Sequence, residues 1–257
     1  MPTERQLDWP HLLNEALTLP GNTGQVYNRF YQYSFLNTLL LRQQGVHEPV
    51  ATYKRWQEIG RHVLKGAKAK KILRPITVKR EDEDGTDETL TRFKLVNCIF
   101  ALSDTDGEDI SLPETPEWNV EHALTKLDIK RVPFKEIDGN MQGYSFKRNI
   151  AISPIAVYPF KTTIHEIGHV VLGHTEGLSI LKVMQHRGLR EFQAESTAHL
   201  VCNELDQLPE DAATVSRGYI QGWLRGDRPA DHLIRQVFAA TDKILRAGRV
   251  TAQEQAA

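Results

Sequence analysis

The sequence His165-Glu166-Ile167-Gly168-His169 limits what this chain can fold into more than any other feature. It lies in a mostly apolar run from Pro159 to His174, whose spacing is typical of a buried helix. Four residues make just over one helical turn, so both imidazoles project from one face of that helix and can bind one zinc ion. Glu166 then lies at the edge of the same site, which predicts a zinc centre with a carboxylate beside it.

A carboxylate in that place can accept a proton from water activated by the ion and pass it to a leaving amine. The motif therefore predicts a zinc metallopeptidase with Glu166 as its catalytic base and a protein or peptide as its substrate. Tyr144 is a candidate donor to the oxyanion that develops during hydrolysis. The alternative interpretation is an exposed helix face of histidine and glutamate that binds no metal.

The third protein ligand must come from another segment, because hydrolytic zinc sites commonly have three. Glu191 and Glu195 lie four residues apart in a second helical run, a little over twenty residues after His169. That distance lets the second helix pack antiparallel to the first. The pair resembles that of gluzincin peptidases, in which the first acid binds zinc and the second hydrogen-bonds a ligand imidazole. We therefore expect Glu191 as the ligand and Glu195 behind it, with the reverse assignment left open. His174 and His199 are expected to be structural.

Charge is strongly segregated along the chain, although the formal net charge is only −1. Residues 1–80 hold 13 Lys and Arg against 5 Asp and Glu, whereas residues 81–117 hold 2 against 12. A basic N-terminal region indicates a polyanionic partner, because Lys and Arg release condensed counterions when they neutralise phosphates. The acidic run EDEDGTDE is interpreted as a solvated turn between two strands.

Turn-forming residues divide the chain into two domains near residue 110, within SDTDGEDISLPETPE. Residues 1–110 are predicted to form a small α+β domain. Its expected elements are a helix over 22–44, a helix from Thr52 that ends at Gly60 or Gly66, and strands over 72–79 and 89–102. Residues 111–257 are predicted to form a mainly helical domain with a small β-sheet. The fold class is therefore α+β.

Basic and aromatic residues are interleaved in the N-terminal domain, as in surfaces that bind single-stranded DNA. Rings of this kind stack on bases, and cations follow the phosphate backbone. The rings near the basic segment are Tyr27, Phe30, Tyr31, Tyr33, Tyr53 and Trp56. The candidate DNA-binding residues are Lys54, Arg55, Trp56, Arg61, Lys65, Lys68, Lys70 and Lys71. The alternative is that most of the rings belong to the core and the lysines solvate a helix end.

Six segments make the chain resemble ArdC-type antirestriction proteins of plasmids and other mobile elements. They are FLNTLLLRQQG, TYKRWQEIGRHVLKGAKAKKILRP, VNCIFALSDTDG, IHEIGHVVLGH, REFQAESTAHLVCNEL and SRGYIQGWL. The resemblance implies an N-terminal single-stranded-DNA-binding domain joined to a zincin-like metallopeptidase domain. The C-terminal segments are also similar to those of ImmA/IrrE-like metallopeptidases.

Two other functions remain open. The ImmA-like resemblance implies a site-specific protease that acts on a repressor, and a non-catalytic DNA-binding module would use zinc only for structure. The two cysteines, Cys98 and Cys202, provide no disulfide framework, and no segment approaches the roughly 18 apolar residues that span a bilayer. We therefore expect a cytoplasmic protein with no membrane partner.

Overall fold

The computed structural model describes residues 7–18, 33–81, 87–111, 117–136, 140–176, 187–226 and 228–250, with the side chains of 78–81 and 87–92 left out. Its mixture of helices and small sheets confirms the α+β class. The contacts divide the chain into two compact units. The N-terminal unit contains the described residues between 33 and 111, and the C-terminal unit contains those from 117 onward. Helix α1 (Trp9–Thr18) belongs to the C-terminal unit by its contacts, whereas the sequence division at residue 110 places it with the first domain.

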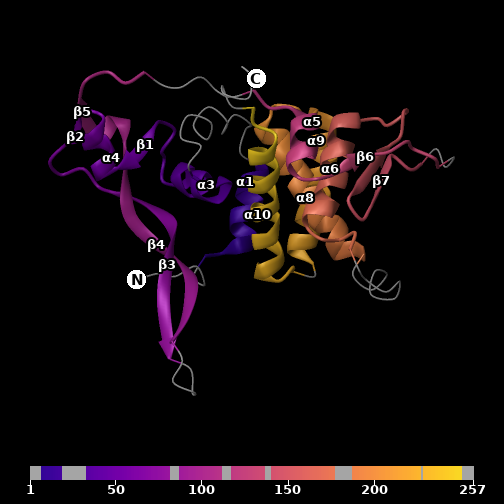
Figure 1. Ribbon diagram of the computed structural model, residues 1–257, viewed down its shortest axis with the longest axis horizontal. Coiled ribbons are helices and arrows are strands. Elements are labelled where there is room, and N and C mark those ends of the chain that lie inside the picture. The colour runs from indigo at the N-terminus through magenta and orange to yellow at the C-terminus, as the bar shows by residue number, and fades with distance from the viewer. Residues whose placement is uncertain are drawn as a thin grey trace. The chain divides into compact units, whose positions relative to one another are not determined.

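The N-terminal unit is built on an antiparallel sheet of order β1-β4-β3, in which β3 and β4 form a long hairpin (Figure 1). Its strands are β1 (Val50–Thr52), β2 (Arg61–Val63), β3 (Lys70–Glu81), β4 (Asp87–Ala101) and β5 (Thr105–Gly107). Its helices are α3 (Phe35–Gln43), α4 (Tyr53–Glu58) and the 3-10 turn η2 (Leu102–Asp104). The β2 and β5 strands pair separately from the larger sheet. Residues 82–86 of the predicted acidic turn lie outside the described residues, as do Tyr27, Phe30 and Tyr31.

Helix α3 is fixed to the outer edge of β3 by two side-chain amides. Asn37 donates to the Leu73 carbonyl and accepts from the Leu73 N–H, at 2.9 and 2.8 Å. Gln44 forms the same pair of bonds with the backbone of Lys71, both at 2.8 Å. These bonds satisfy backbone groups that an edge strand would otherwise leave open. Beside them, apolar residues of α3, of the connection that follows it and of the sheet form the core: Leu41, Val46, Val50, Ile72, Ile99 and Ala101.

Helix α4 begins at Thr52, whose hydroxyl accepts from the Arg55 N–H at 3.2 Å. It ends after one and a half turns, because Gly60 adopts a φ of +78° and directs the chain into β2. This confirms Gly60 as the helix end. For the helix expected over 22–44, the structure shows α3 over Phe35–Gln43, while residues 22–32 lie outside the described part.

The C-terminal unit is mainly helical, with a small sheet of order β6-β8-β7 (Figure 1). Its strands are β6 (Lys130–Arg131), β7 (Gly143–Phe146) and β8 (Asn149–Ile152). Its helices, besides α1, are α5 (Val120–Lys126), α6 (Pro159–Val171), α8 (Arg187–Glu204), α9 (Glu210–Arg225) and α10 (Asp231–Ala247). Helix α8 packs against α6, α9 and α10. No helix in the described part of the chain has the length and apolar character that crossing a membrane requires.

The packing of α6 on α8 positions the site. Ile164 and Ile167 of α6 are fully buried, as are Phe192 and Ala198 of α8. Gly168 lies where the two helices approach closely, since a Cβ built there would be 3.6 Å from the Ala194 Cα. The two polar helix faces are thereby brought to one side of the unit, where β7 also lies against α6.

Candidate metal centre

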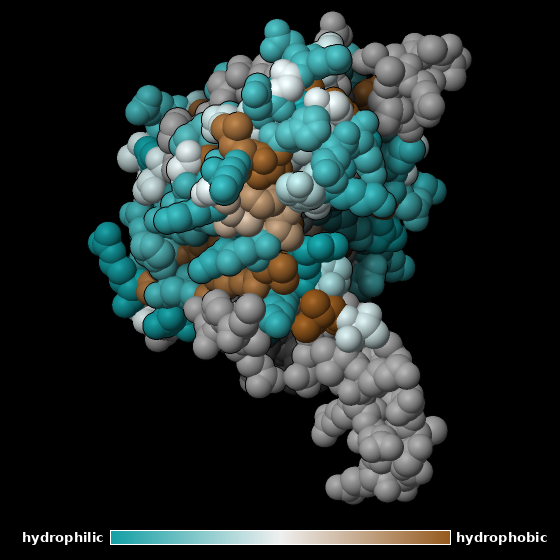
Figure 2. Space-filling view, turned by 90° about the vertical axis from the view of Figure 1, so that its left-hand side faces the viewer, coloured by the Kyte–Doolittle hydropathy of each residue, from teal (hydrophilic) through white to brown (hydrophobic). Residues whose placement is uncertain are grey.

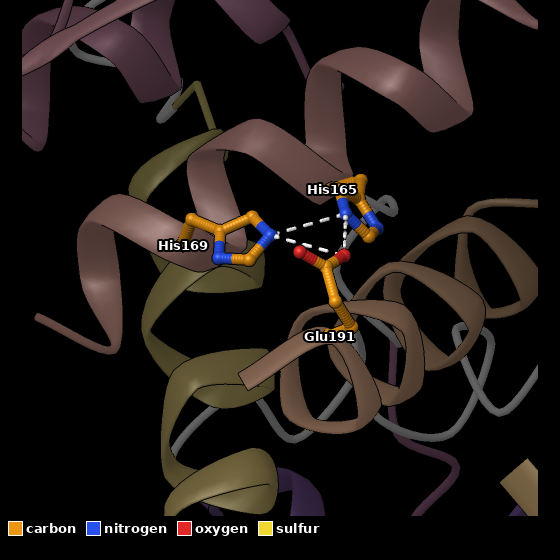
Figure 3. Close-up of side chains that lie close together, drawn as sticks. All are labelled: His165, His169 and Glu191. Atoms are coloured by element: carbon orange, nitrogen blue, oxygen red, sulfur yellow. Dashed lines mark hydrogen bonds and ion pairs between the residues drawn. The ribbon is translucent and has the colours of Figure 1, made fainter. Parts of the chain in front are cut away.

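Three predicted ligand residues come together where α6 faces α8 (Figure 3). One ligand atom from each of His165, His169 and Glu191 lies within 4.8 Å of the other two. The two imidazole Nε2 atoms are 3.2 Å apart, and the Glu191 Oε2 atom is 3.3 Å from His165 Nε2 and 3.6 Å from His169 Nε2. Two imidazole nitrogens and one carboxylate oxygen on rigid helices are a donor set that suits a divalent metal ion.

Glu195 lies one turn behind Glu191 and contacts the other side of His165. The His165 Nδ1–H donates to Glu195 Oε2 at 3.1 Å, and Lys161 Nζ lies 2.6 Å from Glu195 Oε1. Burial opposes ionisation of Glu195, but the His165 hydrogen bond and the Lys161 charge hold its pKa at about 2. Since a carboxylate only accepts, this contact keeps a proton on His165 Nδ1, so Nε2, which faces the other two ligand atoms, is the nitrogen that gives up its proton when the ring binds a metal.

The ionisable groups of the cluster shift one another's pKa values. Burial opposes protonation of His165, but hydrogen bonds to Glu191 and Glu195 outweigh it and raise the pKa of His165 to about 9. Hydrogen bonds from His165 and His169 hold the pKa of Glu191 well below its usual range. Glu191 is therefore a carboxylate over a wide pH range, which is the form that binds metal.

His174 returns to the cluster through the turn that ends α6. Gly173 has a φ of +74°, its N–H donates to the Val170 carbonyl, and the His174 N–H donates to the His169 carbonyl at 2.9 Å. This is a Schellman turn, in which a left-handed residue closes the helix. The turn places His174 Nδ1 3.0 Å from His169 Nδ1. Burial, helped by the nearby His169, lowers the pKa of His174 to about 4, so its ring is neutral at pH 7.

Glu166 lines the same open pocket, of about 960 Å³, as His165, His169 and Glu191. Its side chain is buried, and β7 passes close beside it. A Cβ built on Gly143 of this strand would lie only 3.3 Å from the Glu166 Cγ and 2.9 Å from the Thr162 Cγ2. Glycine at 143 therefore lets the strand pass close over the helix. Tyr144, the predicted oxyanion donor, also lines this pocket.

His199 lies away from the ligand cluster. It is 1% exposed, and burial lowers its pKa to about 4 against the opposing effect of a hydrogen bond to the Leu17 backbone. Its ring is therefore a neutral core residue between α8 and α1, in the structural role predicted from sequence.

The predicted DNA-binding residues of the N-terminal unit differ in exposure: most are exposed, one is partly buried, and two are buried. The exposed cations are Lys54, Arg55, Lys65, Lys68 and Lys71. Lys70 is partly buried and pairs with Asp104 at 3.3 Å. Among the described side chains of this unit, the exposed large apolar ones are Tyr53, Leu64 and Phe93. The face turned to the viewer in Figure 2 shows hydrophobic patches among hydrophilic side chains.

Two of the predicted DNA contacts are wrong. Trp56 is fully buried and its indole N–H donates to the Phe100 carbonyl at 3.0 Å, so no base can stack on it. The Arg61 guanidinium is also buried and donates to Thr105 Oγ1 and to the carbonyls of Thr105, Gly107 and Glu108. Its donors fasten β2 to β5 and are not available to phosphates.

The sequence analysis assigned His174 only a structural role, whereas the structure places its ring against His169 at the candidate metal centre, and Lys161 and Gln193 were not predicted there. Lys161 lies one turn before His165 on the pocket side of α6, a position that its spacing could have indicated. The signal for His174 was Gly173, since glycine after a helix predicts a turn that brings the next residue back. Gln193 carried no sequence signal.

Comparisons with known proteins agree on one fold. Residues 10–103 match the family model for the N-terminal domain of anti-restriction factor ArdC. The structure is similar over 94% of this chain to the antirestriction ArdC protein from the R388 plasmid in two crystal structures. The metal-free one has 19% identity, 96% of its chain covered and a TM-score of 0.52. The Mn(II)-bound one has 17% identity, 98% covered and a TM-score of 0.54.

The chain is also similar to an uncharacterised protein of Bacillus anthracis, pXO2-81, with 25% identity over 82% of this chain. The chain spans 44% of that relative's length.

Proposed function

We propose that this chain, an ArdC-type protein by its N-terminal domain and its fold, is an antirestriction protein that binds single-stranded DNA and carries a zinc-dependent peptidase site. The observation that carries the peptidase half is the cluster of His165, His169 and Glu191 in an open pocket with Glu166 beside it. Two imidazoles and one carboxylate match the ligands of hydrolytic zinc sites, which keep a position open for substrate.

Each residue of the site has its own proposed role in hydrolysis. His165, His169 and Glu191 would hold the ion, with Glu195 orienting His165. A bound zinc ion would supply Lewis-acid chemistry toward the scissile carbonyl. Glu166 takes a proton from the attacking water and returns it to the leaving amine. The open pocket leaves room for a peptide beside these groups.

The buried carboxylate of Glu166 favours hydrolysis over a purely structural zinc site. A structural site closes its fourth position with another protein ligand and needs no base. In the described part of the chain, the only cluster of three metal-binding side chains is this one, and its third member is 41% exposed. A protease that acts on a repressor would use the same site, so only the identity of the substrate distinguishes that alternative from the proposed antirestriction peptidase.

Metal analysis and digestion of a peptide library test the peptidase half. We expect one zinc ion per chain and cleavage by the wild type. Glu166→Gln should keep the metal and lose cleavage, because the amide cannot accept the proton. Cleavage by Glu166→Gln at the wild-type rate would contradict the assigned role, and cleavage confined to a repressor-like sequence would favour the alternative.

The exposed cations carry the DNA half of the proposal. Lys65, Lys68 and Lys71 lie within one short segment, with Tyr53, Leu64 and Phe93 as the exposed apolar side chains of the unit. Phosphates attract such cations and release counterions, and exposed rings stack on bases. Binding should therefore weaken steeply as salt rises.

Charge reversal with a matched control tests this surface. Lys65→Glu, Lys68→Glu and Lys71→Glu together should weaken binding to all single-stranded sequences and reduce the slope of log K against log salt by about 2. The control changes three exposed lysines of the C-terminal unit, Lys130, Lys135 and Lys243, to Glu, with the same net charge change. Equal loss in both variants would show that net charge alone governs binding and would contradict a localised surface.

A cellular assay of DNA protection against restriction joins the two halves. Free thiols at Cys98 and Cys202 fit action in a reducing compartment such as the cytoplasm. We expect protection to fall in both Glu166→Gln and the Lys65, Lys68, Lys71 variant. Loss only in the charge-reversed form would contradict a proteolytic mechanism and leave protection by DNA binding.

A further inference from the structure

The two proposed histidine ligands have different partners on their Nδ1 atoms. His165 donates to a carboxylate, whereas His169 faces a second imidazole, that of His174, at 3.0 Å. Two facing ring nitrogens can bond only if one carries a proton and the other a lone pair. Which of the two carries it decides whether His169 Nε2 is free to bind a metal.

The far end of the His174 ring leads to Gln193. His174 Nε2 lies 3.1 Å from Gln193 Oε1. The Gln193 amide nitrogen contacts the Leu233 carbonyl at 3.1 Å and Gln236 Oε1 at 2.9 Å, both at the start of α10. Because a backbone carbonyl only accepts, the Gln193 atom that faces Leu233 must be the nitrogen. Gln193 is 4% exposed, so this orientation is held inside the packed helices.

The anchored Gln193 amide sets the direction of the hydrogen bonds that link it through His174 to His169. With both N–H groups engaged on α10, Gln193 presents only its oxygen to His174, so His174 Nε2 carries the proton. The two facing Nδ1 atoms share one proton, and a His169 ring that binds an ion through Nε2 carries its proton on Nδ1, so His174 Nδ1 is the acceptor. His169 is left with its lone pair on Nε2, the atom that faces His165 and Glu191.

We infer that His174 and Gln193 are positioning residues that form a neutral hydrogen-bond relay and fix the metal-binding tautomer of His169. The inference rests on the proposed metal site. The His174 backbone is held at both ends, because its N–H donates to His169 and its carbonyl accepts from Arg190 Nη1 at 3.3 Å. The relay thus runs from α10 through α8 and the turn after α6 to the ligand.

The tautomer of His174 in the wild-type protein is the first test. Long-range ¹⁵N–¹H correlation spectra of the zinc-loaded full chain distinguish a proton on Nε2 from one on Nδ1. The relay requires His174 to be protonated on Nε2 alone. A proton on its Nδ1 would overturn the inference, whatever the variants show.

Zinc affinity in two variants of the same shape is the second test. In His174→Asn the side-chain oxygen takes the place of Nδ1 and can accept from His169, whereas His174→Leu has the same size and no acceptor. We expect His174→Leu to bind zinc about 10- to 100-fold more weakly and His174→Asn to recover most of the loss. If the wild type binds no zinc, the metal site itself fails. If it binds zinc and the leucine variant binds equally well, or the asparagine variant is as weak as the leucine one, the relay is wrong.

Discussion

The two sides of the candidate metal centre orient their histidines with different chemistry. On the His165 side, Lys161 and Glu195 form a charged arm, in which a carboxylate contacts the ligand ring directly. On the His169 side, His174 and Gln193 form a neutral arm that ends on the backbone of α10. Both arms aim an Nε2 atom at Glu191, but only the charged arm places a carboxylate in direct contact with a ligand ring.

This difference separates two contributions to metal binding. A carboxylate behind a ligand orients the ring and also raises its basicity, and its bond to the ring is charge-assisted. A neutral relay sets only the tautomer and the direction of the ring. Removing the charged arm should therefore weaken binding of a dication more than removing the neutral arm.

Removal of both imidazoles should have the largest effect. A His165→Ala, His169→Ala variant leaves Glu191 as the sole member of the cluster, so we expect it to retain no zinc. Its thermal stability should no longer rise when zinc is added, because ligand binding stabilises only the folded state that binds it. Stoichiometric zinc in the purified double variant, measured by mass spectrometry, would contradict the proposed ligands.

Loss of the charged arm should cause the second-largest decrease in zinc binding. In Glu195→Gln the amide can still accept from His165, but the negative charge is gone, so zinc affinity should fall by about 100-fold. Glu210→Gln removes one charge from an exposed residue that does not line the pocket and is the control. Competition titration with a chelator measures both. A smaller loss for Glu195→Gln than for His174→Leu would reverse the proposed order of the two arms.

The turn that carries the neutral arm offers an intermediate test. Gly173 has a φ of +74° with no atom within 4 Å of a built Cβ, so Gly173→Ala adds only backbone strain, about 1–2 kcal/mol of unfolding free energy. We expect it also to weaken zinc binding, since His174 follows directly. Gly218→Ala lies within helix α9, also in open space, and should instead stabilise by about 0.5–1 kcal/mol without changing zinc affinity. Denaturant unfolding compares the two, and equal stabilisation by both would contradict the strained turn.

The far end of the neutral arm should show the smallest effect. Gln236→Leu removes one of the two acceptors of the Gln193 amide and leaves the Leu233 carbonyl in place. A hydrogen bond of this kind contributes about 0.5–1.5 kcal/mol of net stability. It is the third hydrogen bond counted from the ligand His169, so removing it should change zinc affinity by less than about threefold. A tenfold loss would show that Gln193 is held mainly by Gln236.

Periodicity made the helices of the site predictable from sequence. Spacing of four residues put His165 with His169 and Glu191 with Glu195, and the structure brings both pairs to one side of the C-terminal unit. That these residues bind zinc stays a prediction. The neutral arm escaped the sequence because it depends on the turn at Gly173 and on the rotational setting of α8 against α10, which only tertiary packing fixes.

In the N-terminal unit, the sequence was less informative about which basic and aromatic side chains are exposed. Composition correctly indicated exposed cations, yet it could not separate them from a buried one. Arg61 is satisfied by carbonyls more than forty residues away in the chain, and Trp56 fills the core beside β4. Helix α1 likewise packs with α9 and α10, contacts that the early position of its residues does not reveal.

X-ray absorption spectroscopy of the zinc-loaded protein tests the metal centre most directly. Distances and multiple scattering count the imidazoles and identify oxygen or sulfur ligands around the ion. We predict two imidazole nitrogens at about 2.0–2.1 Å, oxygen ligands for the rest, and no sulfur. Three imidazoles would contradict the account, because His174 would then bind the ion instead of orienting His169.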